Sequence, residues 1–431
     1  MRTRIDAIAD GLDRFITAER LKLYPRAILI GQVILTVVMI GIPLLIAVEK
    51  QALFPDFAAP WTGARFFLDG RMDELYDVHA QWAFQQEHVR NDAPSWFVSP
   101  PHVALVYSPL ALVSFRTAGL IWTLISIVCV VVSIRLIEPF APRFFRNHRL
   151  ATTLLLLSTY PVFELLGAGQ QSAVTFLLLA AGIRLALADH QGWAGVLFAL
   201  GAIKPQLFIM VPFVLIAMRM WKALATGAVT GLATLALSYL VFGREVFAAW
   251  FEALGSPMYA EMVQIDQAWK MIGLPALAVT LVPPQAAAFV NGLGTLITIA
   301  VVAFACWKIF GWTKAGADPR AVWAGAILAM ILASPHLVAY DLIMVLVPAL
   351  YLAENALNRT TRVTLLVLYL LTWTTAVRHL LALQLIWPVT LIDASWATIS
   401  IVFLWVALDR HLSVESGSAQ LDGTDRPVTD R

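Results

Sequence analysis

Charged side chains are scarce in this chain. Asp, Glu, Lys and Arg make up 13% of its 431 residues, whereas a soluble globular domain has about 25%, so an ordinary soluble protein is excluded. The only two cysteines, Cys129 and Cys306, lie within apolar runs, which favours buried packing over a disulfide or a metal site. The sequence has no HExxH motif, no glycine-rich phosphate loop and no repeat of about 20–50 residues. Nothing therefore indicates a zinc peptidase, a P-loop enzyme or a solenoid.

Long apolar runs are abundant. Hydrophobic residues make up 60% of the chain, and the mean hydropathy is +0.76. The stretch 27–47 carries no charge and is long enough to cross a hydrocarbon core of about 30 Å. Comparable runs recur as far as residue 408, so we predict an all-α integral membrane protein, a polytopic bundle of about 10–12 transmembrane helices. We place spans at about 27–47, 118–137, 150–166, 171–188, 221–241, 286–307, 321–333, 337–353, 362–377 and 391–408.

The stretch 193–218 admits two interpretations: one kinked helix, or two half-helices with Lys204-Pro205 between them. Cytoplasmic loops of membrane proteins are enriched in Lys and Arg. Arg184 closes the preceding span and Arg219 follows the stretch, so a hairpin keeps both flanks in the cytoplasm. With the hairpin, both termini lie inside, and about 70% of the 30 Lys and Arg residues fall on the inner side. We therefore prefer two half-helices.

These assignments divide the chain into three parts. Residues 1–26 form a cytoplasmic amphipathic arm, and residues 27–408 form the transmembrane domain. Within that domain, 48–117 is a first outer loop and juxtamembrane segment that contains short surface helices, and 243–285 is a second outer loop. Residues 409–431 are polar, and we expect a disordered cytoplasmic tail.

Several polar residues fall near the outer ends of their spans with this topology. Ionisable groups in a bilayer are costly and usually mark a site or a water-filled cavity. Their convergence at one depth predicts a single pocket that opens outward. The residues are Asp56, Glu164, Gln170, Gln171, Lys204, His336, Tyr340 and Asp341.

Such a pocket has the parts needed to transfer a sugar from a lipid phosphate. Asp56 is the candidate base for the acceptor hydroxyl. Lys204 and His336 are candidates to bind the departing phosphate. The aromatic side chains of the first loop, Trp61, Tyr76 and Trp96, are candidates to stack on sugar faces. Displacement in a single step by one base inverts the anomeric centre.

Structural roles compete with these functional ones. An Asp that follows a helix end is more often a cap or a solvated loop residue. Lys204 has an alternative partner in Glu164, and the spacing of His336 and Tyr340 is that of two residues on one helical face. Tyr340 and Asp341 also form a candidate hydrogen-bonded pair within the membrane. No single residue decides between these alternatives.

Five short elements, in order, resemble the glycosyltransferase 87 family. The first loop matches that family's DF element, followed by an aromatic residue, a glycine and LYD. Later stretches match its F-x-Y-P-P and P-L, GQ, K-P, and S-P-H with Y-D elements. The matching residues are Asp56-Phe57, Trp61, Gly70, Leu75-Tyr76-Asp77, Phe97-Val98-Ser99-Pro100-Pro101, Ser108-Pro109-Leu110, Gly169-Gln170, Ile203-Lys204-Pro205-Gln206, Ser334-Pro335-His336 and Tyr340-Asp341.

This resemblance implies a GT-C type membrane glycosyltransferase that transfers mannose from a polyprenyl-phosphate donor to a lipid or glycan acceptor. It further implies action at the periplasmic face of the bacterial inner membrane, with the role of base on Asp56 and the phosphate-binding role on Lys204 and His336. Two departures bear on acceptor binding. Ser99 stands where the family has Tyr, and Ala58-Ala59-Pro60 interrupts the aromatic pair that follows DF.

Two other functions compete with the glycosyltransferase. A transporter or flippase for lipid-linked sugars would also carry a charged residue in a broken helix, but the spans show no internal repeat and the polar residues gather near one face. A non-catalytic member of an assembly complex is a third possibility. We expect membrane lipids around the protein, no nucleic-acid partner and no cofactor. No carboxylate cluster has metal-ligand spacing, so we also expect metal independence.

Overall fold

The computed structural model describes residue 11 and residues 17–38, 53–90, 93–380 and 393–422, and these residues contain helices and no β-strand. The helices of the N-terminal half are α2 (Ala18–Thr36), η2 (Pro55–Phe57), α4 (Ala58–Leu68), η3 (Met72–Glu74), α5 (Val78–His88), α6 (His102–Ala111), α7 (Phe115–Leu136), η4 (Glu138–Phe140), α8 (Pro142–Leu157), α9 (Tyr160–Ala168), α10 (Ser172–Leu187), α11 (Gln191–Gly201), η5 (Pro205–Leu207) and α12 (Val211–Ala217). Those of the C-terminal half are α13 (Trp221–Leu254), α14 (Pro257–Tyr259), η6 (Ala260–Ile265), η7 (Ala268–Lys270), α15 (Leu274–Thr280), α16 (Pro284–Gly292), α17 (Gly294–Lys314), α18 (Pro319–Ala333), η8 (Ala339–Val345), α19 (Leu346–Asn355), α20 (Arg359–Leu380) and α21 (Asp393–Asp422).

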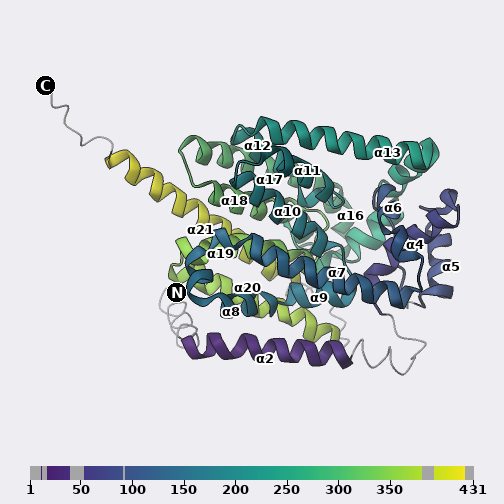
Figure 1. Ribbon diagram of the computed structural model, residues 1–431, viewed down its shortest axis with the longest axis horizontal. Coiled ribbons are helices and arrows are strands. Elements are labelled where there is room, and N and C mark those ends of the chain that lie inside the picture. The colour runs from purple at the N-terminus through teal and green to yellow at the C-terminus, as the bar shows by residue number, and fades with distance from the viewer. Residues whose placement is uncertain (1–10, 12–16, 39–52, 91–92, 381–392, 423–431) are drawn as a thin grey trace.

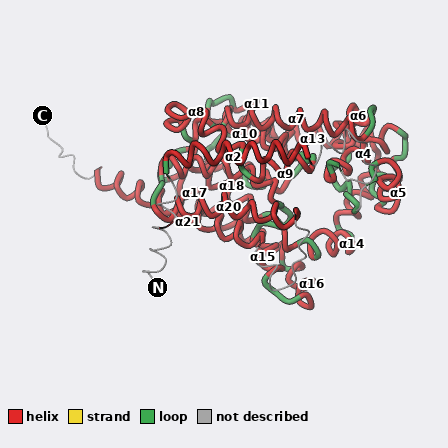
Figure 2. Tube along the Cα trace, turned by 90° about the horizontal axis from the view of Figure 1, so that it is seen from below, coloured by secondary structure: helices red, strands yellow, loops and turns green. Residues whose placement is uncertain are grey.

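Most of these helices lie side by side along the long axis of the molecule (Figure 1). The short helices α4, α5 and α6 of the first polar segment gather at one end of the bundle. From below, α14, α15 and α16 project from one side of the bundle (Figure 2). The two polar segments predicted from the sequence are thus largely helical, and they lie at one end and on one side of the bundle.

Four helices in the described part of the chain are long and apolar enough to cross a membrane, and the pair α8 and α9, bent by 51°, makes a possible fifth. The chain is therefore a helical membrane protein. This count is lower than the 10–12 crossings expected from hydropathy (about 20 apolar residues each), because other apolar runs are divided into shorter helices. The four helices are Phe115–Phe140, Trp221–Leu254, Gly294–Lys314 and Ser395–Val414, and the shorter ones are Leu23–Thr36, His102–Ala111, Ser172–Leu187, Pro205–Ala217 and Pro319–Ala333.

Several predicted boundaries change. The stretch 193–218 is two short helices, α11 and α12, with Lys204 in the break between them, as preferred above. The helix α2 runs through the boundary predicted at residue 26, and the end of that first span lies outside the described residues. The stretch α13 is broken at Gly243, whose backbone is non-helical (φ +79°, ψ 174°), which agrees with the boundary predicted between the span 221–241 and the second polar segment, and helix resumes beyond it as far as Leu254.

Two further predictions concern the C-terminal part of the chain. The tail expected to be disordered from 409 continues as helix α21 to Asp422, and residues 423–431 lie outside the described part. The span expected over 337–353 begins with the 3₁₀-helix η8, and His336 precedes it in non-helical backbone. The interpretation of His336 and Tyr340 as two positions on one α-helical face is therefore wrong.

The helix α18 is the centre of the bundle. Every residue from Ala321 to Ala333 is buried, which is typical of a helix surrounded by other helices on all sides. In a membrane, such packing relies on close van der Waals contact, and small residues allow it. Gly325 is one example, because a Cβ atom there would overlap the ring of Trp312.

The helices α11 and α13 make another close approach. A Cβ atom added at Gly195 would overlap the carbonyl oxygen of Ala223 and the hydroxyl of Thr226. The Thr226 hydroxyl donates to the carbonyl of Gly192 at 3.0 Å, so the two backbones are nearly in contact. Gly231, two turns beyond Ala223 on α13, has nothing within 4 Å of an added Cβ.

We expect Gly195→Ala to lower the free energy of unfolding by about 1–3 kcal/mol, because the extra methyl group forces α11 away from α13. Gly231→Ala is the matched control and should be neutral or slightly stabilising, since alanine is the better helix former. Thermal unfolding in detergent checks both variants. Equal melting temperatures would contradict the close contact.

Candidate active site

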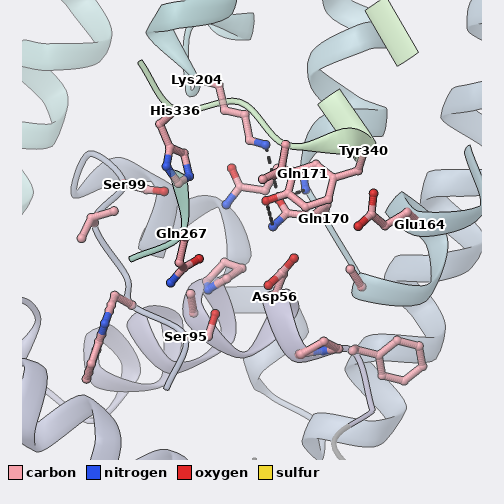
Figure 3. A pocket seen from close by; sticks show the side chains of 18 of the residues that line it. Asp56, Ser95, Ser99, Glu164, Gln170, Gln171, Lys204, Gln267, His336 and Tyr340 are labelled. Atoms are coloured by element: carbon pink, nitrogen blue, oxygen red, sulfur yellow. Dashed lines mark hydrogen bonds between the residues drawn. The ribbon is translucent and has the colours of Figure 1, made fainter. Parts of the chain in front are cut away.

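Asp56 lies in a short turn that its two aromatic neighbours hold in place. Phe54 is buried and adopts a left-handed backbone (φ 54°, ψ 54°), and Phe57 is fully buried. The ring of Phe57 stacks on Phe115 at 5.9 Å and on Trp122 at 6.0 Å, which ties the turn to α7. The Asp56 side chain points into a cavity (Figure 3).

A second turn places Gln170 beside this carboxyl group. Gly169 ends α9 with φ +73°, a conformation that glycine adopts at no steric cost. A Cβ atom there would also lie 2.7 Å from the Cβ of Phe57. The turn thus requires glycine for both its backbone and its packing. The indole of Trp122 donates to the Gln170 carbonyl at 3.3 Å, which holds the backbone of Gln170, the residue after Gly169, in place.

A buried ion pair occupies the opposite wall. The Lys204 ammonium lies 2.8 Å from Asp341 Oδ1, and the two side chains are 15% and 1% exposed. Ser172 donates to the same carboxylate oxygen at 2.6 Å and accepts from Lys204 at 3.0 Å. Gln170 accepts from Lys204 at 3.4 Å and donates to the Tyr340 hydroxyl at 2.9 Å. Lys204 is therefore paired with Asp341, and the alternative pairing with Glu164 is wrong.

His336 and Lys270 reach the cavity from two segments that are joined by their backbones. The amide of Ile272 donates to the Leu337 carbonyl at 2.6 Å. Gly273, with φ +135°, approaches the Ser334 carbonyl so closely that a Cβ atom would overlap it. The second polar segment and the loop before η8 thus form one wall.

The cavity has a volume of about 830 Å³. Its lining includes Asp56, Gln170, Lys204, His336 and Tyr340, all of which were expected from the sequence, and also Trp96. Asp341 lies behind Lys204 as its partner. Side chains from several separate elements therefore meet in one space, as the sequence predicted. Further lining residues include Ser95, Ser99, Tyr160, Glu164, Gln171, Gln206, Trp250, Tyr259, Gln267 and Lys270.

Two candidate sugar-stacking residues do not line this cavity. Trp61 is buried in the core of the first polar segment, with its ring 5.4 Å from Phe115 and 5.9 Å from Phe84. The Tyr76 hydroxyl donates to the Ser99 carbonyl at 2.7 Å, so this residue shapes the segment from behind. Both aromatics therefore support the wall of the site, and the prediction that they face the sugar is not met in this structure.

Tyr259, Gln267 and Lys270 also line the cavity, and they were not among the site residues predicted from the sequence. They belong to the second polar segment, which carries no motif of the resemblance, and only its position between two apolar runs marked it. Part of this segment is the π-helix η6, a form that is frequent at functional sites. The one indication in the sequence that these residues could reach the site was that their polar segment adjoins the predicted pocket.

Burial sets the protonation of the two candidate acid–base groups. Burial raises the pKa of Asp56, and a hydrogen bond from Gln170 and the positive charges of Lys270 and Lys204 offset part of this rise. Burial lowers the pKa of His336 to about 4, to which the charges of Lys204 and Lys270 contribute. His336 is thus neutral at physiological pH. Its Nδ1 atom is buried and has no hydrogen-bond partner in the described part of the chain.

A metal site does not emerge from the described residues. No group of three His, Cys, Asp or Glu side chains gathers there in a way that could hold a metal ion. Metal independence stays a prediction.

The cavity thus brings carboxyl groups and cationic side chains into one space. Residues 97–335, more than half of the chain, match glycosyltransferase family 87, and the chain belongs to this family. It is therefore a membrane glycosyltransferase, and the transporter and scaffold alternatives are not supported. No curated protein and no solved structure matches the chain significantly. The matched region contains Gln170, Lys204 and Lys270, whereas Asp56 precedes it and His336 follows it.

We expect Asp341→Ala and Lys204→Met each to destabilise the protein by about 3–5 kcal/mol, because each leaves the other charge buried and uncompensated. The double variant should lose much less than the sum of the two. Thermal unfolding in detergent of the wild type and the three variants closes this double-mutant cycle. Additive losses would show that the two residues do not stabilise each other.

Proposed function

We propose that the protein transfers mannose from a polyprenyl-phosphate donor to a lipid or glycan acceptor, with inversion of the anomeric centre and with Asp56 as general base. The observation that carries the proposal is the position of Asp56 in a cavity, opposite Lys204 and His336. The proposed location is the periplasmic face of the bacterial inner membrane, on the basis of the distribution of Lys and Arg along the chain.

The chemistry requires one bond to form and one to break. The acceptor hydroxyl oxygen attacks the anomeric carbon while its proton passes to Asp56, and the bond from that carbon to the phosphate oxygen breaks. The leaving group is polyprenyl phosphate, which gains negative charge. A carboxylate with a raised pKa is the stronger base. Asp56 is therefore suited to take the proton as the bond forms.

The opposite wall is suited to the phosphate. Lys204 is held in place by Asp341 and Ser172, so no reorganisation is needed when negative charge develops. Neutral His336 offers a hydrogen bond without adding charge. The apolar side chains of Leu35, Phe163 and Leu254 also line the cavity and provide surface for the first isoprene units of the donor.

The reaction as proposed needs no metal, because the side chains of the cavity supply both the base and the groups that stabilise the phosphate. Transfer by purified protein should then continue after treatment with EDTA. Loss of transfer that added Mg²⁺ or Mn²⁺ restores would refute metal independence.

Asp56→Asn should reduce transfer by about 10²–10⁴-fold, because the amide cannot accept the proton. Membranes that contain wild-type or variant protein are incubated with short-chain polyprenyl-phosphate-mannose and the host's lipid extract, and mannosylated lipid is measured. Asp69→Asn is the matched control, since it removes a carboxylate of the same polar segment that pairs with Arg65 at a partly exposed site.

Each outcome of this comparison has a clear meaning. Product from wild type and Asp69→Asn alone supports both the enzyme and its base. Product from all three proteins removes Asp56 from the mechanism. A lack of product from wild type would refute this combination of donor and lipid acceptor, and the glycosyltransferase would then use a different sugar or acceptor. A loss of thermal stability in Asp56→Asn equal to its loss of activity would instead indicate a structural role.

The rate of transfer should fall on the acidic side of its pH profile, and the midpoint of this acidic limb should lie above the ordinary Asp pKa of about 3.9. The reason is that Asp56 acts when ionised and burial raises its pKa. Gln170→Leu removes a hydrogen bond that favours the ionised form, so its acidic limb should move to higher pH. Gln206→Ala is the control, since that amide lines the same cavity but donates to the His336 carbonyl. A limb that Gln170→Leu leaves in place or moves to lower pH contradicts the assignment.

A further inference from the structure

The cavity contains a second carboxyl group that the proposed mechanism does not use. Glu164 lies on α9 and lines the cavity. Figure 3 shows its carboxyl group and that of Asp56 directed into the same space from two different elements. The helix α9 belongs to a candidate membrane span, where ionisable residues are costly and usually functional.

One side of this carboxyl group is fixed by the protein. Tyr160, one turn earlier on the same helix, hydrogen-bonds the Glu164 side chain, and the Tyr160 ring packs against Trp373 at 5.4 Å. The other oxygen, Oε2, is buried and has no hydrogen-bond partner in the part of the chain that the structure describes. Buried polar atoms in native proteins are nearly always partnered. The orientation of the Glu164 carboxyl group therefore leaves its Oε2 atom to be hydrogen-bonded by a ligand.

The chemistry of the surroundings restricts that ligand. Lys204 is held by Asp341 at 2.8 Å, on the wall that we assign to the phosphate. Glu164 and Asp56 bring two carboxyl groups to the adjacent, acidic side of the cavity, where the charge of Lys270 acts on both of them. A hydroxyl group suits both carboxyl groups, because it donates to a carboxylate and also accepts from a protonated carboxyl group. The acidic side is thus suited to the acceptor.

We propose that Glu164 binds the acceptor through a hydroxyl on the carbon next to the one whose hydroxyl Asp56 deprotonates. The acceptor then belongs to the class of compounds with two adjacent hydroxyl groups, as in a sugar ring. This inference rests on the proposed function. Glu164 orients the attacking oxygen toward the anomeric carbon and takes no part in the transfer of the proton.

The first test separates acceptor binding from donor binding. Transfer by purified protein is measured against increasing host lipid extract at saturating short-chain polyprenyl-phosphate-mannose, and then against increasing donor at saturating extract. Glu164→Ala should raise the apparent KM for the extract by about 10- to 100-fold, the loss expected when a buried polar group is left without its hydrogen-bond partner, and leave the KM for the donor unchanged. Glu164→Gln keeps the shape and a hydrogen-bonding side chain, so it should recover part of the loss. Glu87→Gln, at an exposed position on α5, is the matched control.

A second test addresses the class of acceptor. Periodate cleaves the bond between carbons that carry adjacent hydroxyl groups, so an extract oxidised with periodate and then freed of the reagent should no longer accept mannose from the wild-type protein. An oxidised extract that still accepts at the original rate would overturn the assignment of adjacent hydroxyls.

Failure of the inference and failure of the proposed function are distinguishable. An active wild type with an unchanged acceptor KM in Glu164→Ala overturns the role of Glu164 alone. Equal increases in both KM values for Glu164→Ala and Glu164→Gln would mean a structural role and would also overturn it. A wild type that cannot use the mannose donor refutes the proposed function and this inference with it.

Discussion

The buried ion pair between Lys204 and Asp341 is the interaction on which the site depends. In a low-dielectric interior neither charge is tolerable alone, so the break between α11 and α12 must lie against η8. Ser172 and Gln170 complete the pair through hydrogen bonds, which brings the start of α10 to the same point. One electrostatic requirement thus fixes three segments that are distant in sequence, and the cationic wall of the cavity follows from it.

The acidic wall is fixed by packing instead. Phe54 and Phe57, which flank the Pro55-Asp56 pair, are buried against α7 and against the Gly169 turn. Because that turn ends α9, the position of Glu164 is tied to that of Asp56 through the same glycine. The two walls are therefore built by different forces. Aromatic packing holds the carboxyl groups, and charge pairing holds the cation.

The sequence was informative where chemistry is local and less so where tertiary packing decides. The scarcity of charge and the long apolar runs predicted a helical membrane protein, and the ordered short motifs predicted the family and most of the cavity. Whether an aromatic residue faces the cavity depends on neighbours that are far away in sequence, so Trp61 and Tyr76 could not be assigned to the core in advance. Glu164 was the acidic partner considered for Lys204, and only the fold shows that Lys204 pairs with Asp341. Lys270 had no motif at all.

Helix breaks account for both the lower number of long spans and the location of the site. Backbone that leaves the helix inside a membrane is tolerated only where it is buried in protein or lines a cavity. The Gly169 turn, the break at Lys204 and the loop from Ser334 to Val338 all interrupt apolar stretches, and all three contribute residues to the same cavity. Hydropathy counts such a stretch as a crossing because it measures composition alone. The interruptions that shorten the helices are thus the ones that release backbone and polar side chains to form a binding site, so the lower number of long helices in the described residues and the position of the cavity have the same physical cause.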